Sequence, residues 1–272
     1  MKHAVVTGSS TGIGFGLAKE FLAAGYAVTI SSSNLAKLDN AFERLSKLFP
    51  KENINTCVCD VRSLQDVHSL WDSAFKSFGR VDLWVNNAGV GQDFKYIREL
   101  DEKVVESIID INVKGMINAC IYIYNKMMEQ GFGAIYNMEG FGSDGRKMAK
   151  LSVYGTSKAA LTYFTDSFIK ETKGGKVIVG KISPGMVLTE MLLMPVFSDK
   201  NDVKRFLMVT NILGDKVETV TPWLVQKMKN NTNHGKSFRW LTNLKASGRF
   251  MTAPFRKNRL IREADLKVEF RS

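Results

Sequence analysis

The stretch TGSSTGIG, residues 7–14, follows a short apolar run and precedes helical apolar spacing from Ile13 to Ala24. A strand, a glycine-rich turn and a helix in this order predict a phosphate-binding turn. Gly8 permits a tight turn, Gly12 lets the backbone approach a pyrophosphate, and Gly14 permits close helix–strand packing. The first helical turn offers free N–H groups to phosphates. The residues that we expect to contact a dinucleotide here are Gly8, Ser10, Thr11, Gly12, Ile13 and Gly14.

Strand-like and helix-like stretches alternate along the chain beyond this turn. The expected strands are residues 3–7, 27–31, 54–58, 81–85, 133–137 and 176–182, and the expected helices are 13–24, 35–49, 64–78, 101–129 (with a break) and 153–171. Apolar strands alternating with helices predict an α/β fold, a Rossmann-type doubly wound parallel sheet in three α/β/α layers. Beyond residue 186 the pattern predicts helix over 200–230, interrupted at Pro222, and a last strand within 236–242.

The chain has 272 residues, which suits one or two domains. We predict a single domain over residues 1–272 with a basic C-terminal extension from about 243 to 272. Residues 221–272 hold 12 Lys and Arg against 3 Asp and Glu, so this segment carries +9 (12 − 3) of the chain's formal net charge of +11. Aromatic residues flanked by cations, such as Phe255 beside Arg256, favour peripheral contact with an anionic membrane. A solvated charged face is the alternative, and we expect no nucleic-acid partner because no such module is visible.

Cysteine and histidine usage points away from metal or disulfide sites. Cys57 and Cys59 alternate in a strand-like segment at a spacing that matches no usual zinc or redox motif. The three histidines are scattered, so no metal is expected. No apolar run is long enough to span a bilayer, and a strand pattern begins at the N-terminus. These features predict a cytoplasmic protein, with possible attachment limited to the membrane surface.

The end of the second strand indicates which dinucleotide binds. A site specific for NAD places a carboxylate there for the ribose 2′-hydroxyl, but this chain has Ser31-Ser32-Ser33-Asn34. Hydroxyl and amide groups can hydrogen-bond a 2′-phosphate, and Lys37 follows one helical turn later. We therefore expect Ser32, Ser33 and Asn34 to contact NADP(H). NAD stays an alternative because no arginine lies in the segment.

Three further motifs follow in order: Asn86-Asn87-Ala88-Gly89, then Asn112, then Tyr154-Gly-Thr-Ser-Lys158. With the first turn, they make residues 1–190 resemble the short-chain dehydrogenase/reductase family. The resemblance implies that Asp60 and Val61 flank the adenine and that Asn87, Ala88 and Gly89 line the cofactor. It also implies that the segment holding the nicotinamide carboxamide comprises Pro184, Gly185, Val187 and Thr189.

The chemistry expected of this family is the interconversion of a carbonyl and an alcohol. A tyrosine with a pKa near ~10 is a weak acid–base group at neutral pH. Lys158 lies four residues after Tyr154, on the same helical face, and its charge would lower the tyrosine pKa. Tyr154 is then the general acid in reduction and the general base in oxidation. By resemblance, Lys158 also binds the nicotinamide ribose and Asn112 supports a water molecule in the proton relay.

One position departs from the family pattern. A serine usually stands about thirteen residues before the tyrosine, but this chain has Phe141 there. The nearest hydroxyl is that of Ser143, in a glycine-rich loop, and we predict that it orients the substrate carbonyl. The alternative is that Ser143 is a turn residue and that Tyr154 alone binds the carbonyl.

The unusual loop NMEGFGSDG, residues 137–145, also resembles the chlorophyll b reductase branch of the family, whose members reduce a formyl group with NADPH. The expected substrate lid, residues 186–206, is apolar and deformable through Met191, Leu192, Leu193, Met194, Val196 and Phe197. The lid predicts a small-molecule substrate, a bulky hydrophobic carbonyl or alcohol. The other interpretation is that these apolar residues only seal the core or a subunit interface. The alternatives are a steroid or 3-oxoacyl reductase, and a nucleotide-binding regulatory protein without catalysis. By resemblance we expect a homo-oligomer, a dimer or tetramer formed through the Tyr154 helix.

Overall fold

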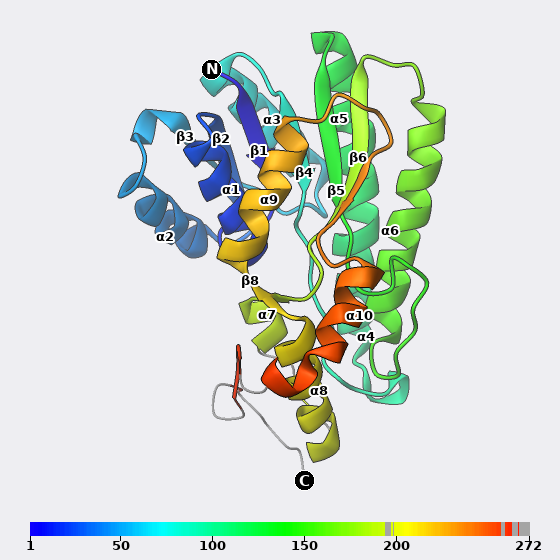
Figure 1. Cartoon of the computed structure of the whole chain (residues 1–272). Helices are drawn as coiled ribbons and strands as arrows, with labels where there is room; N and C mark the ends of the chain where they lie inside the picture. The colour runs from blue at the N-terminus through cyan, green and yellow to red at the C-terminus, as the bar shows by residue number, and fades with distance from the viewer. Residues whose placement is uncertain (194–196, 198, 257–258, 263–265, 267–272) are drawn as a thin grey trace.

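The computed structural model describes residues 1–193, 197, 199–256, 259–262 and 266. Its centre is a seven-stranded sheet in the order β3-β2-β1-β4-β5-β6-β9, and every neighbouring pair is parallel (Figure 1). The strands are β1 (His3–Val6), β2 (Ala27–Ser32), β3 (Ile54–Val58), β4 (Leu83–Asn86), β5 (Gly133–Met138), β6 (Val177–Ser183) and β9 (Ser237–Arg239). This order confirms the predicted Rossmann-type doubly wound sheet.

Helices cover both faces of the sheet (Figure 1). The α-helices are α1 (Gly12–Ala23), α2 (Leu35–Ser46), α3 (Leu64–Phe78), α4 (Glu102–Ile109), α5 (Met116–Gln130), α6 (Ser152–Glu171), α7 (Glu190–Leu193), α8 (Lys200–Leu213), α9 (Val217–Lys229) and α10 (Asn243–Met251). Short 3-10 segments are η1 (Lys51–Asn53), η2 (Ile97–Glu99) and η4 (Ala253–Arg256), and η3 (Asp110–Gly115) is π-helical.

Two cores result from the alternation of side chains along the central strands. On one face, Val6 packs with buried residues of α1, α2 and α9, such as Leu224. On the other face, Val5 packs with buried residues of α3, α5 and α6, such as Leu161. Successive side chains of a strand point to opposite faces, which explains why neighbours in β1 belong to different cores. The sheet is therefore buried on both sides, as the continuous apolar strands predicted.

The predicted interruption of the helix over 200–230 lies at another place. Pro222 sits inside α9, in its second turn. The actual break is at Gly214 and the two-residue strand β8 (Asp215–Lys216), which pairs with β7 (Val187–Leu188). At this position proline removes one intrahelical hydrogen bond, but the buried residues on either side of it, Thr221 and Leu224, pack α9 against the domain and keep it helical. The break expected in 101–129 is confirmed as the π-helical segment η3.

The C-terminal region packs back onto the domain through its basic side chains. Arg249, in α10, forms an ion pair of 2.7 Å with the buried Asp215 and donates to the carbonyl of Leu213. Arg259 lies 3.9 Å from the same carboxylate. Arginines of the predicted basic extension therefore neutralise the buried carboxylate of Asp215. The single domain over residues 1–272 stays a prediction. In the described ranges, no helix combines the length and apolarity needed to cross a membrane.

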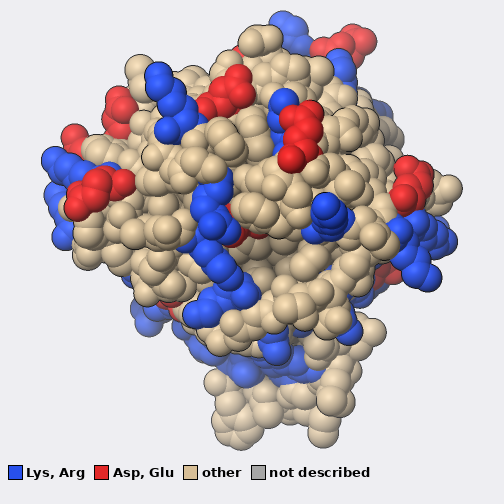
Figure 2. Space-filling model, turned by 90° about the horizontal axis from the view of Figure 1, so that it is seen from above, with Lys and Arg blue, Asp and Glu red and all other residues tan. Residues whose placement is uncertain are grey.

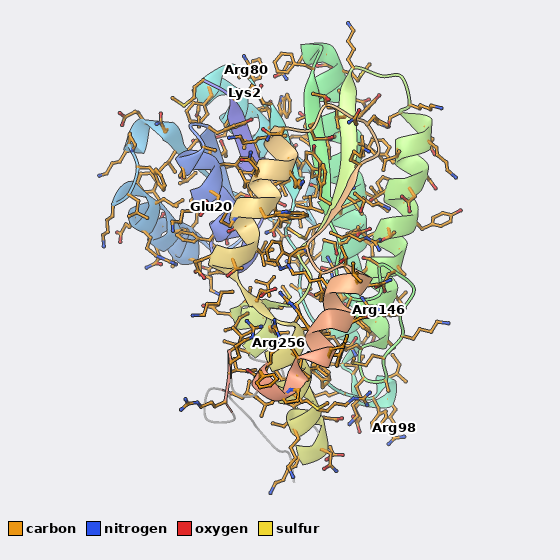
Figure 3. All side chains as sticks on the ribbon, viewed as in Figure 1. Lys2, Glu20, Arg80, Arg98, Arg146 and Arg256 are labelled. Atoms are coloured by element: carbon orange, nitrogen blue, oxygen red, sulfur yellow. The ribbon has the colours of Figure 1, made fainter. Side chains whose placement is uncertain are left out.

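The face of the molecule seen from above carries charge of both signs (Figure 2). Acidic and basic side chains are interspersed around the rim of the face seen from above (Figure 2). Lys2 and Arg80 lie at the end of the molecule where the strands begin, whereas Arg256 lies at the opposite end, near α10 (Figure 3). The carboxyl ends of the parallel strands therefore face α7, α8 and α10. Ligands of open α/β sheets bind at the carboxyl ends of the strands, so a ligand site is expected at this edge.

Candidate active site

The phosphate turn lies between β1 and α1, with a geometry that only glycine permits. Gly8 and Gly12 have positive φ angles of 61° and 57°. A Cβ at Gly14 would fall 2.4 Å from the Gly8 carbonyl oxygen. Thr11, at the N-cap of α1, makes no side-chain capping bond. The N–H groups of the first helical turn are thus left for an anionic ligand, which is the arrangement that binds pyrophosphate.

The turn meets two other predicted cofactor segments. A Cβ at Gly12 would lie 3.3 Å from the Thr189 methyl carbon, so the loop after β7 faces the turn. On the other side, the Ser10 hydroxyl donates to the Ser32 hydroxyl at 3.2 Å. Asn34 accepts a bond from the Lys37 amide and so caps α2. Ser33 is exposed beside it. The cradle and its free N–H groups fit a nicotinamide dinucleotide.

The segment after β4 closes the floor of this cradle. The Thr7 hydroxyl accepts bonds from the amides of Asn87 and Ala88, both at 3.0 Å. The Asn87 side chain donates to the carbonyls of Thr7 and Gly8 at 2.9 and 3.0 Å. These bonds tie β4 to the turn after β1. Asn87 therefore has a structural task in addition to its predicted cofactor contact.

The remaining predicted cofactor residues lie around the same edge. Asp60 and Val61 follow β3; Arg62 donates to the Asp60 carboxylate and holds its pKa below the usual value. Gly185 has a positive φ of 74°, and a Cβ there would fall 2.7 Å from Leu241. Pro184 and Val187 are buried on either side of it. The fold thus brings the predicted segments to one edge, and their contacts with a cofactor stay predictions.

Asn112 lies in the π-helical segment and joins three elements. Its side-chain oxygen accepts from the Val90 amide at 2.8 Å, and its nitrogen donates to the Val90 carbonyl and to Ser157. A Cβ at Gly89 would lie 3.1 Å from the Asn112 oxygen and 3.7 Å from the Lys158 nitrogen. π-helical turns often occur at functional sites. This one brings Asn112 beside Lys158, although the two are 46 positions apart in the chain.

Gln92 orients the start of α6, a task that the sequence did not reveal. Its side-chain oxygen accepts from the amides of Val153 and Tyr154 at 3.1 and 3.0 Å. Its nitrogen donates to the Lys150 carbonyl at 2.9 Å. The side chain thereby satisfies amides of the first turn of α6. A lone glutamine in a loop gives no sequence signal for such a capping contact.

Tyr154 and Lys158 are side by side on α6, as their spacing predicted; Lys158 is buried and Tyr154 is half-buried. The Lys158 nitrogen lies 5.9 Å from the Tyr154 ring centre and donates to the Met138 carbonyl at 3.3 Å. Burial raises the pKa of Tyr154 to about 12 and lowers the pKa of Lys158 to about 8. The expected lowering of the tyrosine pKa by Lys158 is not seen in this structure. Removal from water outweighs the charge of the lysine because it disfavours the ionised phenol.

The loop after β5 places Gly140, not Phe141, beside the tyrosine. A Cβ at Gly140 would fall 2.6 Å from the Tyr154 hydroxyl oxygen. The Ser143 hydroxyl accepts from the Gly140 amide at 3.1 Å and donates to the Lys158 carbonyl at 3.2 Å. Ser143 thus joins the loop to α6 in this structure. Its predicted role toward a substrate carbonyl stays a prediction.

The predicted lid forms a separate apolar cluster. Phe197 is 1% exposed and stacks on Phe94 with ring centres 5.1 Å apart. Leu192 and Leu193 pack against this cluster. Met191 is 53% exposed, and a Cβ at Gly91 would lie 3.1 Å from its Cγ. Residues 194–196 and 198 of the predicted lid, Met194 and Val196 among them, lie outside the described residues.

Comparisons with known proteins identify the family of this chain. The model of the family described as "short chain dehydrogenase" matches residues 2–199. A chloroplastic chlorophyll(ide) b reductase of Oryza sativa subsp. japonica is 33% identical over 259 residues, covering 92% of this chain and 74% of that protein. A probable chlorophyll(ide) b reductase of Arabidopsis thaliana is also 33% identical, over 89% of this chain and 51% of its own length. This chain thus spans about half of the Arabidopsis protein.

A solved structure with the same fold is the 3-ketoacyl-(acyl-carrier-protein) reductase of Brucella melitensis in complex with NADH. Its TM-score is 0.77 at 20% identity, and the match covers 90% of this chain and 98% of that chain. At this identity the likeness shows the shared fold alone.

Proposed function

The chain belongs to the short chain dehydrogenase family and is an NAD(P)-dependent oxidoreductase, and from this premise we propose that it reduces the carbonyl group of a bulky hydrophobic substrate with NADPH. Tyr154 is the proton donor in this proposal. The position of its hydroxyl beside Gly140 and of its ring beside Lys158, at the edge that carries the phosphate turn, is the observation that carries the proposal. The reverse reaction, oxidation of the alcohol, follows the same path backwards.

The cofactor would supply the hydride. The residues that would hold its pyrophosphate and adenosine are Gly8, Ser10, Thr11, Gly12, Ile13, Gly14, Asp60, Val61, Asn87 and Ala88. Those that would hold its nicotinamide end are Gly89, Tyr154, Lys158, Pro184, Gly185, Val187 and Thr189. Ser32, Ser33 and Asn34 would contact the 2′-phosphate. The absence of a carboxylate at the end of β2 supports NADP over NAD.

The charge of Lys158 is what the proposal requires for proton donation. The raised pKa keeps Tyr154 protonated but makes it a weaker acid than an ordinary tyrosine, so proton transfer to a carbonyl oxygen needs a cation beside the tyrosinate that forms. A protonated Lys158 then stabilises the tyrosinate that remains. Asn112 would support the water through which the proton is replaced. Ser143 would add a hydrogen bond to the carbonyl if its hydroxyl turned from Lys158.

The substrate class rests on the apolar lid and on the relatives. Met191 is exposed and lies against Gly91 in the loop after β4, and the next residues, Leu192 and Leu193, pack on the aromatic cluster. Such a surface favours an apolar ligand with few polar groups. The names of the chlorophyll(ide) b reductases, which match most of this chain, support a large ring-shaped carbonyl compound as the first class to assay.

The decisive experiment compares the protein with its Tyr154→Phe variant. We expect wild-type protein to oxidise NADPH in the presence of porphyrin-like, steroid-like or acyl carbonyls, with one class preferred. The variant should retain NADPH binding, measured by fluorescence, and lose at least 100-fold in turnover, the scale of a general acid. Unchanged turnover in the variant would refute the mechanism. Failure of the wild type to bind NADPH or NADH would favour a regulatory protein instead.

The remaining proposals concern assembly and location. Tyr163 on α6 is 78% exposed, which supports a dimer or tetramer formed through this helix. Met251 and Phe255 are 84% and 91% exposed beside the basic C-terminal region, which supports peripheral contact with anionic lipid. Free thiols at Cys57, Cys59 and Cys120 suit a reducing cytoplasm. Light scattering, and co-sedimentation with phosphatidylserine against phosphatidylcholine vesicles, test the first two; a monomer, or equal lack of binding to both vesicles, contradicts them.

A further inference from the structure

The buried carboxylate of Glu139 lies between the sheet and α6, the helix that carries Tyr154 and Lys158. Glu139 follows β5, and its amide donates to the Ile182 carbonyl at 2.8 Å, which fixes it to β6. Its side chain is 0% exposed, and its Oε2 has no hydrogen-bond partner. A buried carboxylate with one oxygen left without a hydrogen bond is costly unless charges of opposite sign lie near it. The surroundings of Glu139 therefore need to be cationic.

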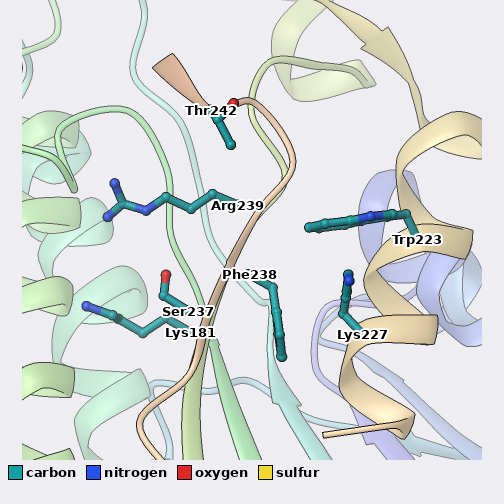
Figure 4. Close-up of a pocket in the computed structure, with 7 residues that line it drawn as sticks. All are labelled: Lys181, Trp223, Lys227, Ser237, Phe238, Arg239 and Thr242. Atoms are coloured by element: carbon teal, nitrogen blue, oxygen red, sulfur yellow. The ribbon is translucent and has the colours of Figure 1, made fainter. Parts of the chain in front are cut away.

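Two cations from neighbouring strands face this carboxylate. The Lys181 nitrogen on β6 is 3.7 Å from Oε1, and an Arg239 nitrogen on β9 is 3.5 Å from Oε2. Figure 4 shows both side chains extending to one side of β9, away from Trp223 and Lys227 of α9. Neither cation interacts with Glu139 alone. Lys181 donates to the half-exposed Asp166 at 2.5 Å, and Arg239 is 44% exposed.

Lys158 is the third cation that Glu139 influences. Glu139 stands between Met138, whose carbonyl accepts from the Lys158 nitrogen, and Gly140, which abuts the Tyr154 hydroxyl. The Thr162 hydroxyl donates to the Lys158 carbonyl at 3.0 Å and is 3.5 Å from Glu139 Oε1. The carboxylate is thus packed against the turn of α6 that carries the lysine.

We infer that Glu139 is a positioning residue whose buried carboxylate is the counter-charge that holds Lys158 as an ammonium beside Tyr154. The inference deepens the proposed function, on which it rests, by assigning the source of the charge that proton transfer needs. Burial alone lowers the pKa of Lys158, and the charge of Glu139 opposes that fall. Burial raises the pKa of Glu139 above its usual value and Asp166 adds to the rise, while Arg239 and Lys181 oppose it and so favour the charged carboxylate.

The charged and titratable groups around this cluster are few. Tyr154 faces Lys158 from the same helix, and the loop after β5 contributes Glu139. Around Glu139 itself lie Asp166 of α6, Lys181 of β6 and Arg239 of β9. Burial lowers the Lys158 pKa, and within the described residues the negative charge of Glu139 is what opposes that lowering. Removal of the Glu139 charge is therefore expected to lower the Lys158 pKa, because no other described carboxylate replaces that charge.

The direct test measures Lys158 itself and needs neither cofactor nor substrate. Protein labelled with 13C at lysine Cε is titrated by NMR, with the Lys158 signal assigned from its loss in Lys158→Arg. In Glu139→Gln the Lys158 pKa should fall by about one unit or more, at least a tenfold loss of the protonated fraction at high pH. Glu139→Asp, which keeps the charge, should restore most of the shift. Asp166→Asn, which alters the same network at its exposed end, should leave Lys158 unchanged.

A Lys158 pKa equal in Glu139→Gln and wild type would overturn the inference. If Glu139→Gln does not fold, the double variant Glu139→Gln/Lys181→Met removes one charge of each sign and provides the same comparison. Turnover gives an independent readout. The alkaline limb of kcat for reduction should move to lower pH in Glu139→Gln while KM for NADPH stays within twofold. A wild type without turnover would sink the proposed function but leave the NMR result interpretable.

Discussion

Gly140 and Tyr154 are in such close contact that a Cβ on the glycine would lie 2.6 Å from the tyrosine hydroxyl oxygen. The two residues come from different elements, the loop after β5 and the start of α6. Lys158 bounds the same space, since its Cε would be 3.2 Å from that Cβ. The contact leaves the hydroxyl room for a substrate oxygen only because position 140 has no side chain.

The first prediction is that Gly140→Ala lowers turnover without preventing folding. Real Cβ atoms do not come within 3.0 Å of a neighbour, so the alanine must displace the Tyr154 hydroxyl from its place. A displacement of about 1 Å can cost on the order of 100-fold in rate. We expect kcat to fall at least tenfold, with NADPH affinity retained in a fluorescence titration. Gly155→Ala, a neighbouring helical glycine with open space around its Cβ, is the matched control and should keep its activity.

The second prediction concerns Gln92, whose side chain caps α6. Gln92→Ala removes three hydrogen bonds and leaves the amides of Val153 and Tyr154 unpaired. Unfolding free energy should fall by about 1–3 kcal/mol, and kcat should fall because Tyr154 loses its anchor. Gln130→Ala is a suitable comparison because Gln130 also bonds three backbone groups, at the far end of α5. Equal loss of activity in the two variants would contradict a positioning role for Gln92.

The third prediction tests cofactor choice. Ser32→Asp places a carboxylate at the end of β2, where it can accept from a ribose 2′-hydroxyl and repels a 2′-phosphate. The ratio of the Kd for NADH to the Kd for NADPH should fall at least tenfold in the variant. Ser77→Asp, at an exposed position near the end of α3, adds the same charge away from the turn and should leave the ratio unchanged. A wild type that prefers NADH would reverse our cofactor assignment.

The fourth prediction is a pH dependence of stability that originates at His3. Burial lowers the pKa of this histidine from 6.5 to about 4, and its ring bonds Arg80 and Thr29. Between these values the unfolded chain binds a proton that the folded protein does not, so stability falls as the pH drops from 6.5 to about 4. Between pH 7 and pH 5 the loss should be about 2 kcal/mol. Denaturant unfolding of His3→Gln should show a pH slope smaller by that amount, and an unchanged slope would exclude His3 as the source.

The sequence determined the fold because its signals are local. Apolar strands, helical spacing and the turn over residues 7–14 each depend on neighbours in the chain. The four-residue spacing of Tyr154 and Lys158 likewise fixed their shared helix face. Where local signals conflict, tertiary contacts decided the outcome. Pro222 was expected to interrupt a helix, yet packing retains α9 across it.

The surroundings of the pair could not be predicted, because they depend on distances between remote segments. Gln92 reaches α6 across 61 and 62 positions, and Arg239 reaches Glu139 from the last strand of the sheet. The sequence also suggested that charge would control the tyrosine, whereas burial raises its pKa. The sequence by itself thus specified which groups are present and on which elements they lie. Only the tertiary structure decided how far each was removed from water and which charge faced it, because desolvation and Coulombic energies depend on three-dimensional distance rather than on order in the chain.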